Sequence, residues 1–327
     1  MNPFNYVRAE DPEAAIAAIT VEGKFLAGGT NLIDLMKNHV EEPRTLVDVN
    51  RISLSAIELL PSGGLRLGAL ARNSDTANHP LVRQRYPLLA QAILSGASPQ
   101  LRNLATNGGN LLQRTRCPYF MDTGFPECNK RAPGSGCGAL NGDNRMHAIL
   151  GTSEQCIAVH PSDMCVALTA LEAVIRLRGK AGERQMAIAD FHRLPGATPE
   201  LDTNLRPDEL IVSIDLPPSP YSVHASYVKV RDRSSYAFAL VSVAAALEMV
   251  NGQIRSARIG LGGVAHKPWR AAESEAFLVG KEPGRESFEG AAQQALKEAA
   301  GFRDNGFKIE LARRCIVRAL AQAGGVV

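Results

Sequence analysis

The sequence of 327 residues lacks long apolar runs, a strong net charge and a compact catalytic motif. No run of eighteen apolar residues occurs, so we expect no membrane-spanning helix. The formal net charge is only +3, which does not favour a nucleic-acid partner. The N-terminal residues lack the basic start and apolar centre of a signal peptide. No residues form a hydrolytic triad or a carboxylate pair, so the sequence does not indicate substrate chemistry in this chain.

The composition is that of an ordinary folded protein, with 45% hydrophobic and 21% charged residues. The chain is too long for one simple core and indicates two or three packed units. Residues 217–220, Pro-Pro-Ser-Pro, cannot continue a sheet interior and mark a boundary. Helical and strand patterns alternate without an internal repeat, so we predict an α+β fold.

Apolar spacing and turn residues predict the individual elements. Asp11 before Pro12 favours a helix start, and Asn251-Gly252 favours a tight hairpin turn. Strands are expected at residues 24–27, 45–49, 63–71, 173–177, 184–188, 210–216, 226–230, 237–249 and 253–264. Helices are expected at residues 13–19, 31–37, 79–94, 162–171, 269–278, 286–300 and 309–322.

Two segments share one arrangement, in which Gly-Gly and a small polar residue precede apolar residues with helical spacing. They lie at residues 25–32, around Gly28-Gly29-Thr30-Asn31, and at residues 105–111, around Gly108-Gly109-Asn110. Glycine lets the backbone approach an anion, and the N–H groups at a helix start attract negative charge. Neither segment matches the three-glycine dinucleotide fingerprint or the nucleotide loop with its lysine. One such segment is usually only a turn, whereas two can supply donors to both sides of a diphosphate.

Cysteines concentrate in residues 114–157, a stretch rich in Arg, Pro and Gly that has no apolar periodicity. A long irregular stretch in a compact domain is usually functional. Cys165 and Cys315 instead lie in helical apolar patterns and are expected to be buried thiols. The gaps of 11, 9 and 19 residues between the clustered cysteines do not match a zinc ribbon. Spacing alone leaves open a zinc ion, an iron–sulfur cluster, and unliganded or disulfide-linked thiols. The four clustered cysteines are Cys117, Cys128, Cys137 and Cys156.

Four motifs resemble those of the medium, FAD-binding subunit of the xanthine dehydrogenase and carbon monoxide dehydrogenase family, which belongs to the molybdenum hydroxylases. The resemblance extends over essentially the whole chain. Within the family, the chain most resembles the FAD subunit of periplasmic aldehyde oxidoreductase. The motifs are Lys24–Leu32 (KFLAGGTNL), Thr106–Asn110 (TNGGN), His160–Asp163 (HPSD), and Tyr227–Arg233 (YVKVRDR) leading to Ala237–Ala239.

The resemblance implies a two-part FAD-binding domain of the vanillyl-alcohol-oxidase (PCMH-like) type over residues 1–220. Its subdomains would span about residues 1–56 and 57–220, and the second would contain the cysteine-rich loop 114–157. A C-terminal α/β domain of the CO dehydrogenase flavoprotein type would span residues 221–327.

The resemblance also implies which residues bind FAD. Asp163 would bind near the ribose, Ile211 would pack on the cofactor, and Lys229 would lie near the flavin, where a cation stabilises the reduced form. Without the resemblance, we would expect Asp163 to be a helix cap and Lys229 a strand-surface charge. The residues on one side of the diphosphate would be Lys24, Phe25, Leu26, Ala27, Gly28, Gly29, Thr30, Asn31 and Leu32, and those on the other side Thr106, Gly109 and Asn110.

The cysteine-rich stretch corresponds, by the resemblance, to an insertion of roughly forty residues between Asn110 and Asp163. Such insertions in the aldehyde oxidoreductase subunit and in 4-hydroxybenzoyl-CoA reductase carry a [4Fe–4S] cluster, which implies Cys117, Cys128, Cys137 and Cys156 as ligands. His147 and His160 are further candidate ligands, although loop histidines are usually solvated. Five basic side chains in the loop would offset the cluster's charge, namely Arg114, Arg116, Lys130, Arg131 and Arg145.

The function that the resemblance implies is electron transfer. A molybdenum-cofactor large subunit would oxidise an aldehyde, and a [2Fe–2S] small subunit would pass the electrons to this chain's FAD and on to an external acceptor. This chain itself has no molybdenum-site signature. Reversed flow, as in 4-hydroxybenzoyl-CoA reductase, and a non-enzymatic metal-stabilised interaction module are the alternatives. At least a heterotrimer is expected, located in the periplasm by co-export with a signal-bearing partner, or otherwise in the cytoplasm.

Overall fold

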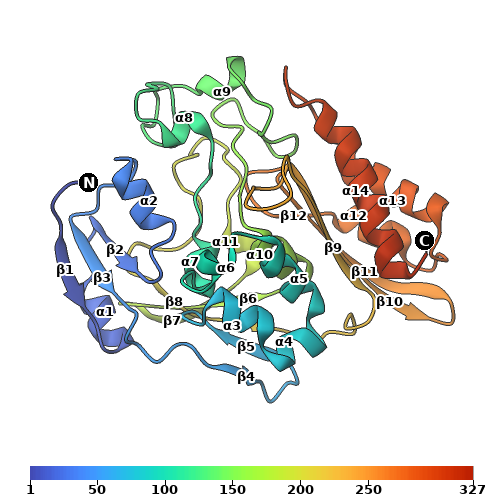
Figure 1. Ribbon diagram of the computed structural model, residues 1–327, viewed down its shortest axis with the longest axis horizontal. Coiled ribbons are helices and arrows are strands. Elements are labelled where there is room, and N and C mark those ends of the chain that lie inside the picture. The colour runs from blue at the N-terminus through green and yellow to red at the C-terminus, as the bar shows by residue number, and fades with distance from the viewer. Residues whose placement is uncertain (327) are drawn as a thin grey trace.

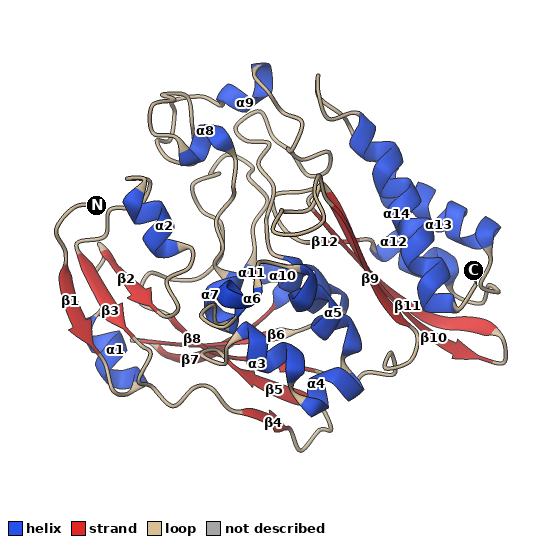
Figure 2. Ribbon diagram, in the orientation of Figure 1, coloured by secondary structure: helices blue, strands red, loops and turns tan. Residues whose placement is uncertain are grey.

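The computed structural model describes residues 1–326, which form three separate sheets with helices around them (Figure 2). The sheets take their strands from residues 5–48, 57–216 and 225–270. This mixture of parallel sheet, antiparallel sheets and helices is the α+β fold that the sequence predicts. Within the described residues, no helix has the length and apolarity needed to span a membrane.

The N-terminal part is a parallel sheet in the order β1-β3-β2. Its first helix begins as predicted, because the Asp11 carboxylate accepts a hydrogen bond from the Ala14 N–H at 2.7 Å and Pro12 follows Asp11. The first Gly-Gly segment connects the end of β2 to α2. The elements are β1 (Asn5–Arg8), α1 (Pro12–Ala18), β2 (Gly23–Leu26), α2 (Leu32–Lys37) and β3 (Thr45–Asp48).

The second part is an antiparallel sheet in the order β4-β5-β8-β6-β7, whose apolar side chains share one core with helices α5 and α10. The second Gly-Gly segment forms the short helix α7. The strands are β4 (Ile57–Leu59), β5 (Leu65–Gly68), β6 (Val174–Gly179), β7 (Gly182–Ala187) and β8 (Leu210–Leu216). The helices are α3 (Asn73–Asn78), α4 (Pro80–Arg85), α5 (Pro87–Ser95), α6 (Pro99–Arg102), α7 (Asn107–Leu111), α10 (Asp163–Ala170) and α11 (Ile188–Phe191).

The cysteine-rich stretch lacks long regular elements, as predicted. It contains only two four-residue helices in its described residues, α8 (Pro118–Met121) and α9 (Gly138–Asn141). Figure 1 shows both helices at the top of the molecule, away from the three sheets.

The C-terminal part is an antiparallel sheet in the order β12-β11-β10-β9, contacted by α12 and α14 and also by α5 and α10 of the second part. Residues 241–247 of β10 are all buried, which explains why they are apolar except for Ser242. The β10–β11 turn is the predicted one, since Asn251 and Gly252 both have positive φ, 50° and 80°. The elements are β9 (Ala225–Val230), β10 (Val241–Val250), β11 (Gln253–Gly262), β12 (Trp269–Arg270), α12 (Ala272–Leu278), α13 (Arg285–Leu296) and α14 (Phe307–Gly324).

Three predicted helices are wrong in extent, of which the one expected at residues 286–300 ends at Leu296. The helix expected at residues 79–94 is divided at Tyr86, because Pro87 has no N–H to continue α4 and instead begins α5. The helix expected at 269–278 begins only at Ala272, since residues 269–270 pair with β11 as strand β12. The short elements β1, β4 and α3 were not predicted.

Candidate functional site

Both Gly-Gly segments line the same cleft, which has a volume of about 870 Å³. Its walls come from the β2–α2 connection, α7, the start of α10, strand β8 and strand β9. Pockets that bind small molecules commonly measure about 300–1,000 Å³. The structure brings every residue predicted to bind FAD into this cleft: Lys24, Phe25, Leu26, Ala27, Gly28, Gly29, Thr30, Asn31, Leu32, Thr106, Gly109, Asn110, Asp163, Ile211 and Lys229.

Gly28 is where the two segments touch. A Cβ atom at this position would lie 2.0 Å from the backbone oxygen of Leu104 and 3.2 Å from the Cα of Ala105, the residue before Thr106. Any other residue would therefore push the first segment away from the second. The neighbouring Gly29 has a φ of +70°, which side chains rarely adopt. Glycine is thus needed here for close approach and for backbone conformation.

The first segment offers free hydrogen-bond donors to the cleft. Within the described chain, the backbone N–H groups of residues 28–31 donate to no other protein atom. The side-chain Nδ2 of Asn31 is buried without a partner, while its Oδ1 accepts from the Arg114 N–H at 3.1 Å. These donors at the start of α2 match the acceptor oxygens of a phosphate group.

The second segment is held by the protein itself. The Gly109 N–H donates to the Thr106 Oγ at 3.2 Å, and the Asn110 N–H donates to the Thr106 carbonyl at 2.9 Å. The Asn110 side chain donates to Asn73 at 2.7 Å and accepts from the Ser162 hydroxyl at 2.5 Å. The Thr106 hydroxyl proton therefore remains available as a donor, and Asn110 acts mainly by fixing the shape of the cleft.

Asp163 and Lys229 form a buried ion pair at the cleft, with Oδ2 and Nζ 2.7 Å apart and side chains only 8% and 4% exposed. The Tyr227 hydroxyl donates to the other carboxylate oxygen at 2.7 Å, and burial followed by Asp163 raises the tyrosine pKa well above its usual value. Tyr227 therefore stays a donor. The two expectations made without the resemblance are wrong, because Ser162 caps α10 instead of Asp163, and Lys229 is not a surface charge.

The four clustered cysteines line one small cavity. Cys128 and Cys137 lie opposite each other in a short antiparallel bridge, and none of the cysteines forms a disulfide within the described residues. No three of these thiols lie within 4.8 Å of one another in the described residues. Cys137 and Cys156 are hydrogen-bonded to each other, and all four thiols face the same cavity.

The cavity gives the thiols different acidities. Burial raises the pKa of Cys117 to about 12. A hydrogen bond from Cys156 lowers the pKa of Cys137 to about 6, and the same bond, followed by burial, raises the pKa of Cys156. Metal ligation requires thiolates, so a metal would have to displace protons from this site.

The loop's basic side chains are not gathered around the cysteines as the sequence suggested. Arg114 and Arg116 line the larger cleft. Arg131 donates to carbonyl oxygens of its own loop, and Arg145 is paired at the surface. Lys130 alone among the five lines the cysteine cavity, with its side chain 1% exposed.

Asp202 joins the cleft to the cysteine-rich stretch, and no sequence pattern pointed to it. Its carboxylate pairs with Lys130 at 2.5 Å and Arg114 at 2.7 Å. Burial opposes its ionisation, but these two cations hold its pKa well below the usual value. The network depends on contacts between residues about seventy to ninety positions apart, which single-sequence patterns do not reveal.

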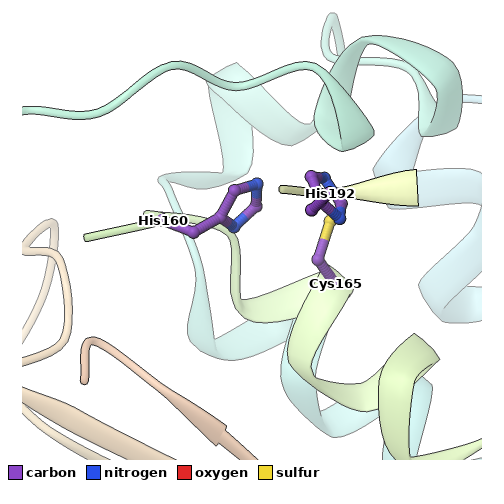
Figure 3. Close-up of side chains that lie close together, drawn as sticks. All are labelled: His160, Cys165 and His192. Carbon is purple, nitrogen blue, oxygen red and sulfur yellow. The ribbon is translucent and has the colours of Figure 1, made fainter. Parts of the chain in front are cut away.

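A buried group of His160, Cys165 and His192 lies beneath the second segment (Figure 3). The His192 Nε2 bonds the Leu111 carbonyl at 2.8 Å, and the His160 Nδ1 accepts from the Ser162 N–H at 3.3 Å. These contacts leave an N–H on His160 and a bare nitrogen on His192, and the rings pack edge to face with centroids 4.4 Å apart. The bond from His192 to the Leu111 carbonyl supports the end of α7. His160 is buried, not solvated as a loop histidine usually is.

Comparison with known proteins assigns the family. The family sequence model for the FAD-binding domain in molybdopterin dehydrogenase matches residues 2–219. The family sequence model for the CO dehydrogenase flavoprotein C-terminal domain matches residues 226–323. The chain belongs to the FAD-binding medium subunits of the xanthine dehydrogenase and CO dehydrogenase family.

Individual relatives agree with this assignment. The chain is 51% identical to the aldehyde oxidoreductase FAD-binding subunit PaoB of Escherichia coli K12, over 99% of both chains. It is 30% identical to the glyceraldehyde dehydrogenase medium chain of Sulfolobus acidocaldarius, over 85% of this chain and 82% of that one. Among solved structures, carbon monoxide dehydrogenase from Hydrogenophaga pseudoflava matches 99% of this chain and 98% of that chain, with a TM-score of 0.78 and 26% identity. The FAD-binding subunit fold predicted from the sequence is therefore confirmed.

Proposed function

We propose that this chain is the FAD- and [4Fe–4S]-containing electron-transfer subunit of a molybdenum-dependent aldehyde oxidoreductase. The aldehyde substrate class rests on the relative with 51% identity over nearly the whole chain. A bound flavin exchanges one or two electrons, so it can link single-electron iron–sulfur centres to an external acceptor. The convergence of both Gly-Gly segments on one cleft carries the proposal.

The residues of the cleft fit FAD in character. The free N–H groups of residues 28–31, the unpartnered Asn31 Nδ2 and the Thr106 hydroxyl would bind the diphosphate. Asp163 and Lys229 would bind the polar parts of the cofactor from the opposite wall, and Ile211 would pack against it. Asn110 would position the second segment.

The cysteine cavity fits a [4Fe–4S] cluster held by Cys117, Cys128, Cys137 and Cys156. Its support is the convergence of four free thiols from one irregular stretch on one cavity. Metal ligation would also stabilise a segment that has few regular elements of its own.

The remaining parts of the proposal concern the assembly. A large subunit with the molybdenum cofactor and a small subunit with [2Fe–2S] clusters would complete at least a heterotrimer, located in the periplasm by co-export with a signal-bearing subunit. We propose domain limits of 1–220, divided near residue 56, and 221–327, which agree with the breaks between the three sheets.

The direct test is the composition and reactivity of the purified complex. We expect one FAD and one four-iron cluster for each copy of this chain, together with molybdenum in a partner subunit. Aldehyde should bleach the flavin absorbance. A folded complex without flavin in this subunit refutes the proposal, and reduction of a thioester by a low-potential donor without aldehyde oxidation favours the reversed flow.

Cys128→Ser tests the cluster separately. The variant should lose the [4Fe–4S] signal in electron paramagnetic resonance and keep its FAD, because Cys128 lies in the cysteine cavity and not in the FAD cleft. Cys315→Ser is the matched control, since Cys315 is a buried thiol of the C-terminal core. An unchanged iron signal in Cys128→Ser removes this residue from the ligand set.

A further inference from the structure

The side chain of His147 reaches one of the four cavity cysteines. Its Nε2 lies 3.1 Å from the Cys117 sulfur, and the side chain is buried. Its other ring nitrogen, Nδ1, has no partner among the described residues. A protonated thiol could donate to this nitrogen, but a metal-bound thiolate can only accept, so with Cys117 as a ligand the Nε2–H is the donor to the sulfur.

The backbone of His147 is held by a buried lysine from the C-terminal part. Lys308, in the first turn of α14, is fully buried and forms no ion pair with a described carboxylate. Its Nζ donates to the carbonyl oxygens of His147 at 2.8 Å, Gly263 at 2.5 Å and Met146 at 3.4 Å. Asn305 adds bonds to the His147 carbonyl at 3.3 Å and the Ala148 carbonyl at 3.1 Å.

Burying a lysine ammonium group without an ion-pair partner is energetically unfavourable. Burial lowers the pKa of Lys308 to about 7, which shows how unfavourable the site is for an ammonium group. An apolar side chain would fill the same space without that cost, but it could not hold three carbonyl groups in fixed positions. One of these carbonyls belongs to the residue that contacts Cys117.

We propose that His147 tunes the redox potential of the proposed cluster by donating a hydrogen bond to Cys117, and that Lys308 is the positioning residue for this donor. A hydrogen bond to a cluster sulfur stabilises the reduced form, whose negative charge is greater, and so raises the potential. The C-terminal part thereby acts on a site whose four cysteines all come from the cysteine-rich stretch. The inference rests on the proposed cluster.

The test compares cluster midpoint potentials in the whole complex, measured by redox titration followed by electron paramagnetic resonance. His147→Leu, which has no donor, and Lys308→Met, which keeps the length without N–H groups, should both shift the potential to more negative values. His147→Gln keeps an N–H donor, so its potential should lie between those of the parent and His147→Leu. Lys297→Met is the control, because Lys297 lies exposed in the same C-terminal part and should leave the potential unchanged.

The double variant separates positioning from general damage. If Lys308 acts through His147, then His147→Leu with Lys308→Met should shift the potential no further than His147→Leu alone. Additive shifts overturn the positioning role, and an unshifted potential in both single variants overturns the whole inference. If His147→Leu takes up no iron, Lys308→Met and His147→Gln decide the matter. Absence of a cluster from the parent complex instead refutes the proposed function.

Discussion

At the scale of single residues, the most informative contact is the ion pair between Asp163 and Lys229. Both side chains are almost completely buried, and Tyr227 occupies the second carboxylate oxygen. A buried charge is tolerated when its partner and its hydrogen bonds are complete. The pair also links α10 to β9, so it fixes the cleft wall to the C-terminal sheet.

Removing one partner of this pair should be severe. Lys229→Met leaves the Asp163 carboxylate buried without a counter-charge, and we expect a loss of about 3 kcal/mol in the free energy of unfolding. Urea denaturation monitored by circular dichroism measures it. The double variant Asp163→Asn, Lys229→Met should lose less than Lys229→Met alone. Equal losses would show that the cost comes from packing and not from the uncompensated charge.

At the scale of elements, the sequence predicted best where local residues decide the structure. Asp11 begins α1, and Asn251-Gly252 turns the β10–β11 hairpin, because capping and positive φ depend on neighbouring residues alone. Strand β1 was missed because all four of its residues are exposed and show no alternation, and β12 was missed because its two residues are ordered by pairing with β11. Tertiary contacts decide such short elements.

Ser162 connects two elements of the site and should contribute more to stability than an ordinary helix cap. Its Oγ accepts from the Cys165 N–H at 3.1 Å at the start of α10 and donates to Asn110 of α7. Ser162→Ala should cost about 1–2 kcal/mol of unfolding free energy. Ser98→Ala, at the cap of the short helix α6, removes a cap without such a second contact and should cost less. Equal costs in urea denaturation would contradict the link between α10 and α7.

At the scale of the whole molecule, the cleft and the cysteine cavity were found from motifs, whereas the charges that join them were not. The glycine pairs and clustered cysteines are visible in sequence because each group is local. The network of Asp202, Arg114 and Lys130 and the contact of Lys308 with His147 arise only when distant segments fold together. The predicted placement of five loop cations around the cysteines failed for this reason.

Buried histidines should make the folded protein sensitive to acid. Burial lowers the pKa values of His192 and His266 to about 4, whereas an unfolded histidine titrates near 6.5. Between these values the unfolded chain binds more protons, so stability falls as pH falls from about 6.5 to 4, by up to about 3 kcal/mol for each histidine. Urea midpoints across this range measure the loss. In His192→Gln, stability should fall less steeply as pH falls. A loss of stability parallel to that of the parent would show that His192 does not cause the acid sensitivity.

FAD affinity of the assembled complex, after the flavin has been removed and titrated back, tests the shared cleft most directly. Gly28→Ala places a methyl group 2.0 Å from the Leu104 oxygen and must separate the two Gly-Gly segments. Gly306→Ala is the matched control, because a methyl group there meets open space. We predict that the parent and Gly306→Ala bind FAD equally well and that Gly28→Ala binds at least about tenfold more weakly. Unchanged affinity in Gly28→Ala would contradict FAD binding by the two segments together.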